Sequence, residues 1–190
     1  MGLKDLFGRR KAPTAAARDR LFALSTAQVT LESELGMKSA GVAAVIFKPM
    51  SAGEFTRAES DLEQLLGSVA AEAGSEIERK SDKFGFEWLI VRDPDLEDQV
   101  TAANLIASEL SDAGFGPQLL AAAFRFEGKK EEPVYWIYGF KNAKFWPFIP
   151  TGDGESRDNA EELELKAKLE KELPIEPDLT KWLALYDAPI

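Results

Sequence analysis

PVYWIYGFKNAKFWPFIPTGDGESRDNAEELEL, residues 133–165, is the densest aromatic stretch of the chain and runs into a charged segment. Residues 134–139 are mostly aromatic or β-branched, and such residues fit the pleated surface of a strand better than a helix. The short polar run 141–144 separates them from a second extended segment, residues 145–150. The sequence therefore predicts a β-hairpin.

The second arm of this hairpin carries two prolines, Pro147 and Pro150, which have no backbone donor for a central ladder. We therefore expect this arm at the edge of a sheet. Trp146 and Phe148 are two residues apart, so their side chains point to the same face of the strand. These two aromatic rings either cover the core or face a partner.

Upstream of the hairpin, the apolar periodicity predicts alternating helices and strands. Apolar repeats of three and four residues with capping-box or glycine signals indicate helices, and short apolar runs between turn residues indicate strands. Pro13 and the alanines at 15–17 are interpreted as a linker. The expected helices are 21–35, with a restart near Ser25, 51–73 and 95–114, and the expected strands are 42–49, 77–83, 86–91 and 119–126.

The inner part of this order matches the split βαββαβ motif, which packs its helices on one face of an antiparallel sheet. We therefore predict an α+β fold. It is a two-layer sandwich with a mainly antiparallel sheet, with helices on one face, and with the hairpin and a last helix added at the C-terminal side. A meander with a different strand order is the main alternative.

The last helix follows the hairpin. Ser156 or Asp158 is its expected N-cap, and Pro174 ends it. Beyond that proline, the chain is too apolar to be disordered throughout. Asp178 is expected to cap a further turn that places three apolar side chains on the body, namely Trp182, Leu183 and Tyr186.

The composition limits the chemistry. With 190 residues and 45% apolar content the chain can fill one core, so we expect a single α+β domain at 21–190, preceded by a basic segment and linker at 1–20. The sequence has no cysteine and no histidine, which excludes disulfides and zinc–thiolate sites and removes the commonest general base. Carboxylates near Asp93 and Glu161 are interpreted as acids at helix starts rather than cation ligands. We therefore expect no catalytic residue, metal or cofactor, and a protein that is not an enzyme.

The charge is unevenly distributed. A net charge of −10 argues against nucleic acid as a partner, because phosphate contacts need clustered Lys and Arg. Residues 1–20, however, carry six basic and only two acidic side chains. No apolar run approaches the roughly 18 residues of a membrane span, and no secretion signal is evident, so we expect a cytoplasmic protein.

The basic N-terminal segment is a candidate membrane contact. Its apolar side chains fall on one helical face, and its cations could meet lipid phosphates at the inner face of the membrane. The alternative is a mobile basic terminus, or a leader that packs on the domain, since a helix this short is marginal alone. The candidate contact residues are Leu3, Lys4, Leu6, Phe7, Arg9 and Arg10.

A candidate partner face lies where the hairpin meets the last helix. It consists of Trp146, Phe148, Arg157, Asp158 and Asn159, because aromatic residues with Arg are common anchors of interfaces. The alternative for the three polar residues is a structural one, in which they cap the helix and form a salt bridge that locks it to the hairpin.

Several segments resemble the PspA-associated protein PspAB family. They are MGLKDLFGRRK at 1–11, LFALSTAQVTLE at 21–32, GFGPQLLAAAF at 114–124, KFWPFIP at 144–150 with RDNAEELEL at 157–165, and LPIEPDLTKWLALYDAP at 173–189. The resemblance implies an accessory cytoplasmic role near PspA, the coiled-coil membrane-remodelling protein of the phage-shock response to membrane stress. It also implies proximity to an HtpX-like membrane protease. It carries no active site over to this chain.

Two functions remain open from the sequence. The first is a non-enzymatic adaptor of the envelope stress response that binds protein partners, with the membrane surface as a further candidate. The second is a small-ligand-binding module in which Trp88, Trp136 and Trp146 line an aromatic pocket. An enzyme would need a carboxylate pair in a cleft, and no spacing in the sequence nominates one.

Overall fold

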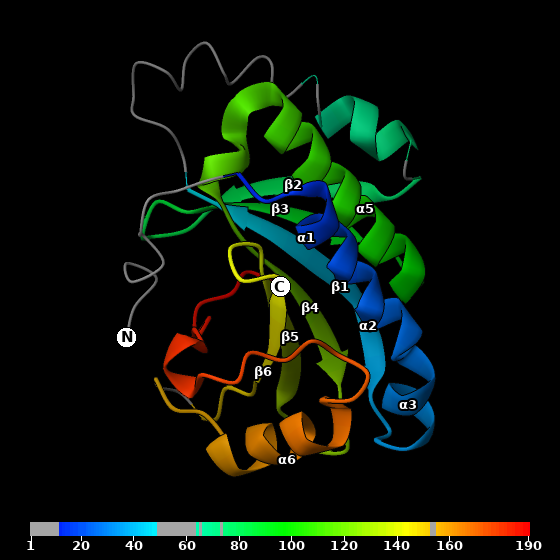
Figure 1. The fold of residues 1–190 in the computed structure, drawn as a ribbon, viewed down its shortest axis with the longest axis vertical. Coiled ribbons are helices and arrows are strands. Elements are labelled where there is room, and N and C mark those ends of the chain that lie inside the picture. Colours follow the sequence, from blue (N-terminus) through cyan, green and yellow to red (C-terminus); the bar gives the residue numbers. More distant parts are fainter. Residues whose placement is uncertain (1–11, 49–63, 65, 73, 153–154) are drawn as a thin grey trace.

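The computed structural model describes residues 12–48, 64, 66–72, 74–152 and 155–190 (Figure 1). The expected helix at 51–73 lies mostly outside the described residues. Of this range the structure describes residues 64 and 66–72, and these are helical. Gly74, its expected C-cap, has φ of +69° and donates its N–H to the carbonyl oxygen of Ala70 at 3.0 Å, as predicted for a helix end.

Six antiparallel strands form one open sheet in the order β2-β3-β1-β4-β5-β6. The first four positions reproduce the order of the split βαββαβ motif, so the α+β prediction is confirmed and the meander is excluded. The hairpin β5–β6 extends the sheet beside β4, with β6 at the edge as its prolines predict. The strands are β1 (Lys38–Phe47), β2 (Glu76–Ser81), β3 (Glu87–Arg92), β4 (Leu119–Glu127), β5 (Pro133–Gly139) and β6 (Lys144–Phe148).

The helices gather mainly on one face of this sheet (Figure 1). The long helix α5 packs on β1, β3 and β4, and the N-terminal helices pack beside α5, where Leu21, Leu24 and Leu31 are fully buried. Helix α6 lies below the sheet and contacts β6. The α-helices are α1 (Ala15–Asp19), α2 (Ala23–Thr26), α3 (Gln28–Ser33), α5 (Leu96–Leu110) and α6 (Asn159–Leu169), with 3-10 turns at Arg20–Phe22, Gly116–Gln118 and Leu179–Lys181 and a wide turn at Ser111–Phe115.

The linker prediction for Pro13 and residues 15–17 was wrong for the three alanines, because they belong to helix α1. Thr14 caps α1 by accepting a hydrogen bond from the N–H of Ala17 at 3.1 Å. Arg18 reaches Ser108 on α5, and the hydroxyl of Tyr138 on β5 donates to the carbonyl oxygen of Ala17. The folded body therefore begins before residue 21, at or before Thr14.

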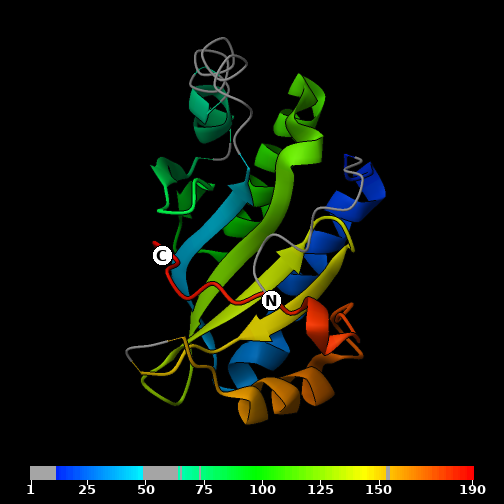
Figure 2. The same ribbon diagram turned by 90° about the vertical axis from the view of Figure 1, so that its left-hand side faces the viewer.

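The two faces of the sheet are covered differently. Cross-strand partners share a face, so Ala43, Phe124 and Trp136 lie together on the face that carries the helices. The opposite face is crossed by the C-terminal segment, which we define as residues 174–190 (Figure 2). The indole N–H of Trp146 donates to the carbonyl oxygen of Leu183 in this segment at 3.0 Å. The sheet is thus enclosed by helices on one side and by an extended segment on the other.

A bulge interrupts β1 where the register with β4 shifts between Ser39 and Ala43. Gly41 adopts φ of +74° there, a conformation that favours glycine. The buried amide of Gln99 on α5 donates to the hydroxyl oxygen of Ser39 at 2.8 Å and to the carbonyl oxygen of Asp93 at 2.7 Å. Helix α5 is therefore fixed to the bulge by a polar contact as well as by apolar packing.

Replacing Gly139 by alanine should destabilise the protein. A Cβ atom at this position would lie 2.8 Å from Cζ3 of Trp146, a buried ring that cannot move easily. The expected loss in the free energy of unfolding is about 1–3 kcal/mol, measured by chemical denaturation. Gly128→Ala is the matched control, because its Cβ would meet Val134 at an ordinary 3.6 Å. Equal stabilities of the two variants would contradict this packing.

Candidate functional site at the β6 edge

The outer edge of β6 is closed by other parts of the same chain. An exposed strand edge offers unpaired N–H and C=O groups to any passing strand. At Phe145 the N–H donates to the carbonyl oxygen of Pro174 at 2.9 Å, and the carbonyl oxygen accepts from the N–H of Glu176 at 2.9 Å. The C-terminal segment therefore forms a short parallel bridge at Ile175, which covers the first part of this edge.

Side chains and backbone after the hairpin close the rest of the edge. Pro147 has no N–H, and its carbonyl oxygen accepts from Arg157 at 3.4 Å. The N–H of Ile149 donates to the carboxylate of Glu162 at 2.8 Å, and its carbonyl oxygen accepts from the N–H of Asp158 at 2.9 Å. Along residues 145, 147 and 149, every outward backbone group thus has a partner.

Arg157 connects the three elements that meet at this edge. Its Nε lies 2.9 Å from both carboxylate oxygens of Glu162 on α6, and its Nη1 donates to the carbonyl oxygen of Trp182 at 3.1 Å. Its guanidinium carbon lies 5.0 Å from the centre of the Phe148 ring, a cation–π contact with β6. One side chain therefore binds the strand edge, the helix and the C-terminal segment, and we call this group the Arg157 clamp.

The clamp is a nearly dry ion pair. Only 15% of the Arg157 side chain and 2% of the Glu162 side chain are exposed. Burial raises the pKa of Glu162 above the ordinary value of a glutamate, while Arg157 and the N–H of Ile149 lower it by a smaller amount. Burial is thus the dominant influence on the pKa of Glu162, and removing one partner of such a buried pair costs more than the pair itself contributes to stability.

Asp158 starts helix α6, which confirms one of the two predicted N-caps. Its carboxylate accepts from the N–H of Glu161 at 3.0 Å and pairs with Lys130 at 3.0 Å. The backbone bond to Glu161 and then the contact with Lys130 lower the pKa of Asp158. Asn159 is the first helical residue and is exposed.

Trp146 and Phe148 share one face of β6, as predicted, but both rings are buried inside the molecule. Trp146 is bonded to Leu183, and the Phe148 ring meets the Tyr186 ring edge-on at 5.3 Å between centres. The two rings therefore cover the core under the C-terminal segment and do not reach the surface. Of the five residues of the candidate partner face, only Asn159 is exposed, and Arg157 and Asp158 form the cap and salt bridge of the structural alternative.

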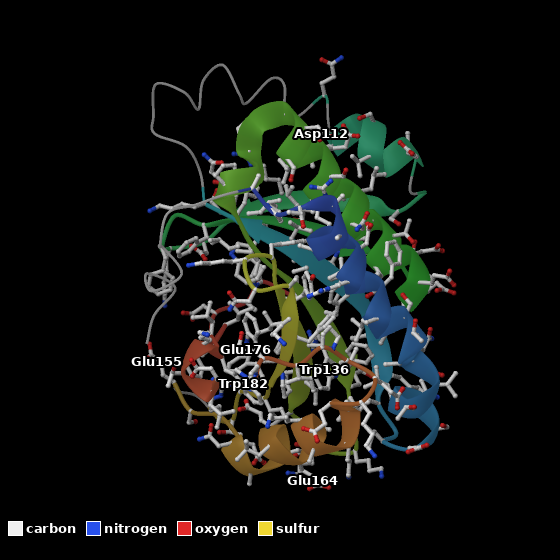
Figure 3. All side chains as sticks on the ribbon, viewed as in Figure 1. Asp112, Trp136, Glu155, Glu164, Glu176 and Trp182 are labelled. Atoms are coloured by element: carbon white, nitrogen blue, oxygen red, sulfur yellow. The ribbon has the colours of Figure 1, made fainter. Side chains whose placement is uncertain are left out.

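The aromatic pocket expected from three tryptophans is not formed. Trp136 on β5 pairs with Pro147, whereas Trp146 on β6 pairs with Ile137. Because neighbouring residues of a strand point to opposite faces, Trp136 and Trp146 stand on opposite faces of the sheet. Trp88 lies on β3, three strands away from β5. The fourth tryptophan, Trp182, lies apart from Trp136 (Figure 3), and its indole N–H donates to the carbonyl oxygen of Glu176 at 2.9 Å. Because Trp136 stands on the other face of the sheet, the three tryptophan rings do not line one pocket.

Several clamp residues had only a weak signal in the sequence. Glu162 lies three residues before Leu165 and seven before Leu169, a spacing that puts all three on one side of α6. All three side chains are buried. That position marks it as a buried acid in need of a cation. The carbonyl oxygens of Pro174 and Trp182 carry no sequence signal, because their roles depend on contacts between distant segments.

Asp93 and Asp95, two of the carboxylates considered as cation ligands, are engaged in hydrogen bonds. Asp93 accepts from Ser75 at 2.9 Å and from the N–H of Asp95, and Asp95 caps α5. Within the described ranges, no group of three or more His, Cys, Asp or Glu side chains is placed to hold a metal ion. The residues of the predicted membrane contact, Leu3 to Arg10, lie outside those ranges.

Two substitutions separate the partners of the clamp. Arg157→Ala leaves a buried carboxylate without its cation and should cost about 3–5 kcal/mol of unfolding free energy near neutral pH. Glu162→Gln keeps an acceptor for Ile149 and should cost less, about 1–2 kcal/mol. Urea denaturation of both variants and the parent protein measures the difference, and a larger loss for Glu162→Gln would contradict the clamp.

The cost of Arg157→Ala should also depend on pH. Without Arg157 the pKa of Glu162 rises further, so the folded variant binds a proton more tightly than its unfolded chain. Such a group adds stability below its raised pKa and loses that contribution as the pH increases through it. The stability deficit of Arg157→Ala should therefore shrink as the pH is lowered from about 8 to about 5.

Comparison with known proteins agrees with the resemblance seen in the sequence. The family model described as PspA associated protein B matches residues 1–190. Neither a curated protein nor a solved structure matches the chain. In the described part of the structure, no helix has the length and apolar content needed to cross a membrane. The chain belongs to the family of PspA associated protein B.

Proposed function

We propose that this protein is a non-enzymatic accessory protein of the PspA-type envelope stress response, acting in the cytoplasm by binding protein partners. The observation that carries the proposal is the family match, which extends over residues 1–190. The family's description as PspA associated makes PspA the first partner to test, and an HtpX-like membrane protease the second.

The chemistry of the chain supports a binding role. The sequence has neither histidine nor cysteine, the side chains that most often act as general bases and nucleophiles. The most buried polar group at the β6 edge, the Arg157 clamp, has its donors turned to Glu162, Trp182 and Pro147. These contacts hold the strand edge, the helix and the C-terminal segment together, which supports a binding role for this part of the chain.

The accessible part of the candidate partner face is its rim. Because the rings of Trp146 and Phe148 are buried and Arg157 is mostly buried, a partner would meet the exposed Asn159 and the half-buried Asp158 at the start of α6. Lys130 pairs with Asp158 there and adds a cation with a mostly exposed side chain. Both carboxylate oxygens of Asp158 are bonded, one to the N–H of Glu161 and the other to Lys130, which holds this side chain in place.

Blocking the rim should weaken binding to PspA. Asn159→Arg places a long charged side chain at the start of α6 and should lower the affinity for purified PspA by about tenfold or more, measured by isothermal titration calorimetry. Thr101→Arg is the matched control, since Thr101 is also polar and exposed but lies on α5. No binding by the parent protein would contradict the PspA partnership, and equal losses in both variants would contradict the rim.

The basic N-terminal segment is proposed as a second contact, with the anionic inner surface of the membrane. Its apolar residues Leu3, Leu6 and Phe7 alternate with Lys4, Arg9 and Arg10, a composition typical of segments that lie in the headgroup region. Cations in such a segment contribute about 1 kcal/mol each at an anionic surface.

Flotation with vesicles tests this contact. The full chain should float with anionic vesicles and remain unbound with neutral ones, and a version lacking residues 1–12 should bind neither. Equal behaviour of the two chains on anionic vesicles would show that the terminus is not an anchor. This result is independent of the PspA measurement.

A further inference from the structure

The turn between β5 and β6 carries basic side chains in a chain that is acidic overall. It holds the exposed Lys141 and the half-buried Lys144. The N–H of Ala143 donates to the carbonyl oxygen of Gly139 at 2.8 Å, which closes the turn. Both cations are therefore held at a fixed end of the sheet.

Helix α1 brings a further cation to the same end. The hydroxyl of Tyr138, at the end of β5, donates to the carbonyl oxygen of Ala17 in α1. Arg20 follows α1 and is exposed. Burial raises the pKa of Tyr138, and the nearby charge of Arg20 lowers it by less. Figure 2 accordingly shows α1 in blue close to the yellow turn of the hairpin.

The N-terminal segment joins the body at this end as well. Ala12 is the first described residue and lies against Gly116, where an added Cβ atom would be 2.5 Å from the methyl carbon of Ala12. Gly116 begins the short turn that leads into β4, and the N–H of Phe140 donates to the carbonyl oxygen of Leu120 on that strand at 3.1 Å. The proposed membrane segment, whose residues 9–11 are all basic, is therefore attached to the body beside the β5–β6 turn.

An exposed apolar side chain stands next to the same turn. Leu179 is 49% exposed and opens the 3-10 turn at 179–181. The buried carboxylate of Glu176 accepts from the amide of Asn142 in the β5–β6 turn at 3.0 Å and from the N–H of Asp178 at 3.1 Å. Lys181 lies 3.4 Å from Asp178, so this pair adds no net charge beside the leucine.

We define the basic face by four side chains, namely Arg20, Lys141, Lys144 and Leu179. Helix α1, the β5–β6 turn and the turn at 179–181 lie along the same side of the molecule in Figure 2. The stretches 12–20 and 133–152 together carry four basic side chains and one acidic side chain, whereas the whole chain carries 23 and 33. An anionic surface therefore attracts this side and repels the rest of the molecule, which selects one orientation.

The exposed leucine favours a lipid surface over nucleic acid. Lysine and arginine bind the phosphates of either partner, whereas an apolar side chain gains free energy where it leaves water, as at the boundary between headgroups and acyl chains. The acidic remainder of the chain also opposes a long polyanion that would extend beyond this face. Anionic headgroups therefore match both the charge and the apolar side chain of the basic face.

We propose that the basic face lies on the anionic surface of a membrane, with Leu179 at the headgroup boundary and the three cations on lipid phosphates. The proposal rests on the membrane contact proposed above for the N-terminal segment, and it adds the orientation of the folded body. The rim at Asn159 stays accessible to a protein partner in this orientation. Its Lys130 lies in the β4–β5 loop, at the other end of β5 from the basic turn.

Binding of the full chain to vesicles of phosphatidylglycerol and phosphatidylcholine tests the face. The double variant Arg20→Glu with Lys141→Glu should lower the vesicle partition coefficient by about tenfold or more, because two attractive charges become repulsive. Lys38→Glu with Lys129→Glu is the matched control. Both lysines are exposed, the change in net charge is the same, and they lie at the opposite end of the strands. The control should stay within about twofold of the parent value, since distant charges are screened.

The outcomes separate this face from the N-terminal contact. Thermal melting first shows that both double variants are folded. If deletion of residues 1–12 abolishes binding but Arg20→Glu with Lys141→Glu binds as the parent does, the N-terminal contact stands and the basic face is wrong. Equal losses in the two double variants would also overturn the face, because they would show an effect of net charge alone. Absence of binding by the full chain would overturn both contacts.

A fluorescent probe measures the orientation directly. The sequence has no cysteine, so a single introduced cysteine can be labelled with an environment-sensitive dye. Leu179→Cys should show a blue shift and stronger emission on anionic vesicles, whereas Glu131→Cys, exposed in the β4–β5 loop, should show neither. No change at position 179, or equal changes at the two positions, would contradict the proposed orientation.

Discussion

The closed edge of β6 is the constraint on which the C-terminal third of the structure depends. A strand at a sheet edge must have its outward N–H and C=O groups hidden or paired, or it will join other strands. Here Pro147 removes one donor, and Phe145 and Ile149 are bonded to segments that follow in sequence. Because Arg157 and Glu162 take part in this closure, the position of α6 and the path of residues 174–190 are fixed by the same few contacts.

Local patterns predicted the elements well, since each depends on residues close in sequence. The two prolines placed β6 at an edge, and the apolar repeat before Gly114 predicted α5 with a start near Asp95, which the structure shows as its cap. The helical residues 15–17 were mistaken for a linker, because the contacts of Ala17 and Arg18 with β5 and α5 have no local signal.

The candidate site was predicted only in part for the same reason. The sequence identified Arg157, Asp158 and the shared face of Trp146 and Phe148, but it left open whether the rings faced the core or a partner. That outcome is decided by the C-terminal segment, which reaches Trp146 through Leu183, 37 residues later. The bulge at Gly41 and its contact with Gln99 are likewise products of long-range packing.

The C-terminal segment also has a consequence for how the protein is made. It is translated after all the strands it covers, so a sheet that forms before residues 174–190 are in place has one uncovered apolar face and an open β6 edge. Such intermediates are prone to aggregate, because exposed edges and apolar surfaces recruit other chains. The charged loop at 128–132 and the prolines of β6 precede this segment in the chain, and charges and prolines of this kind disfavour the pairing of exposed edges.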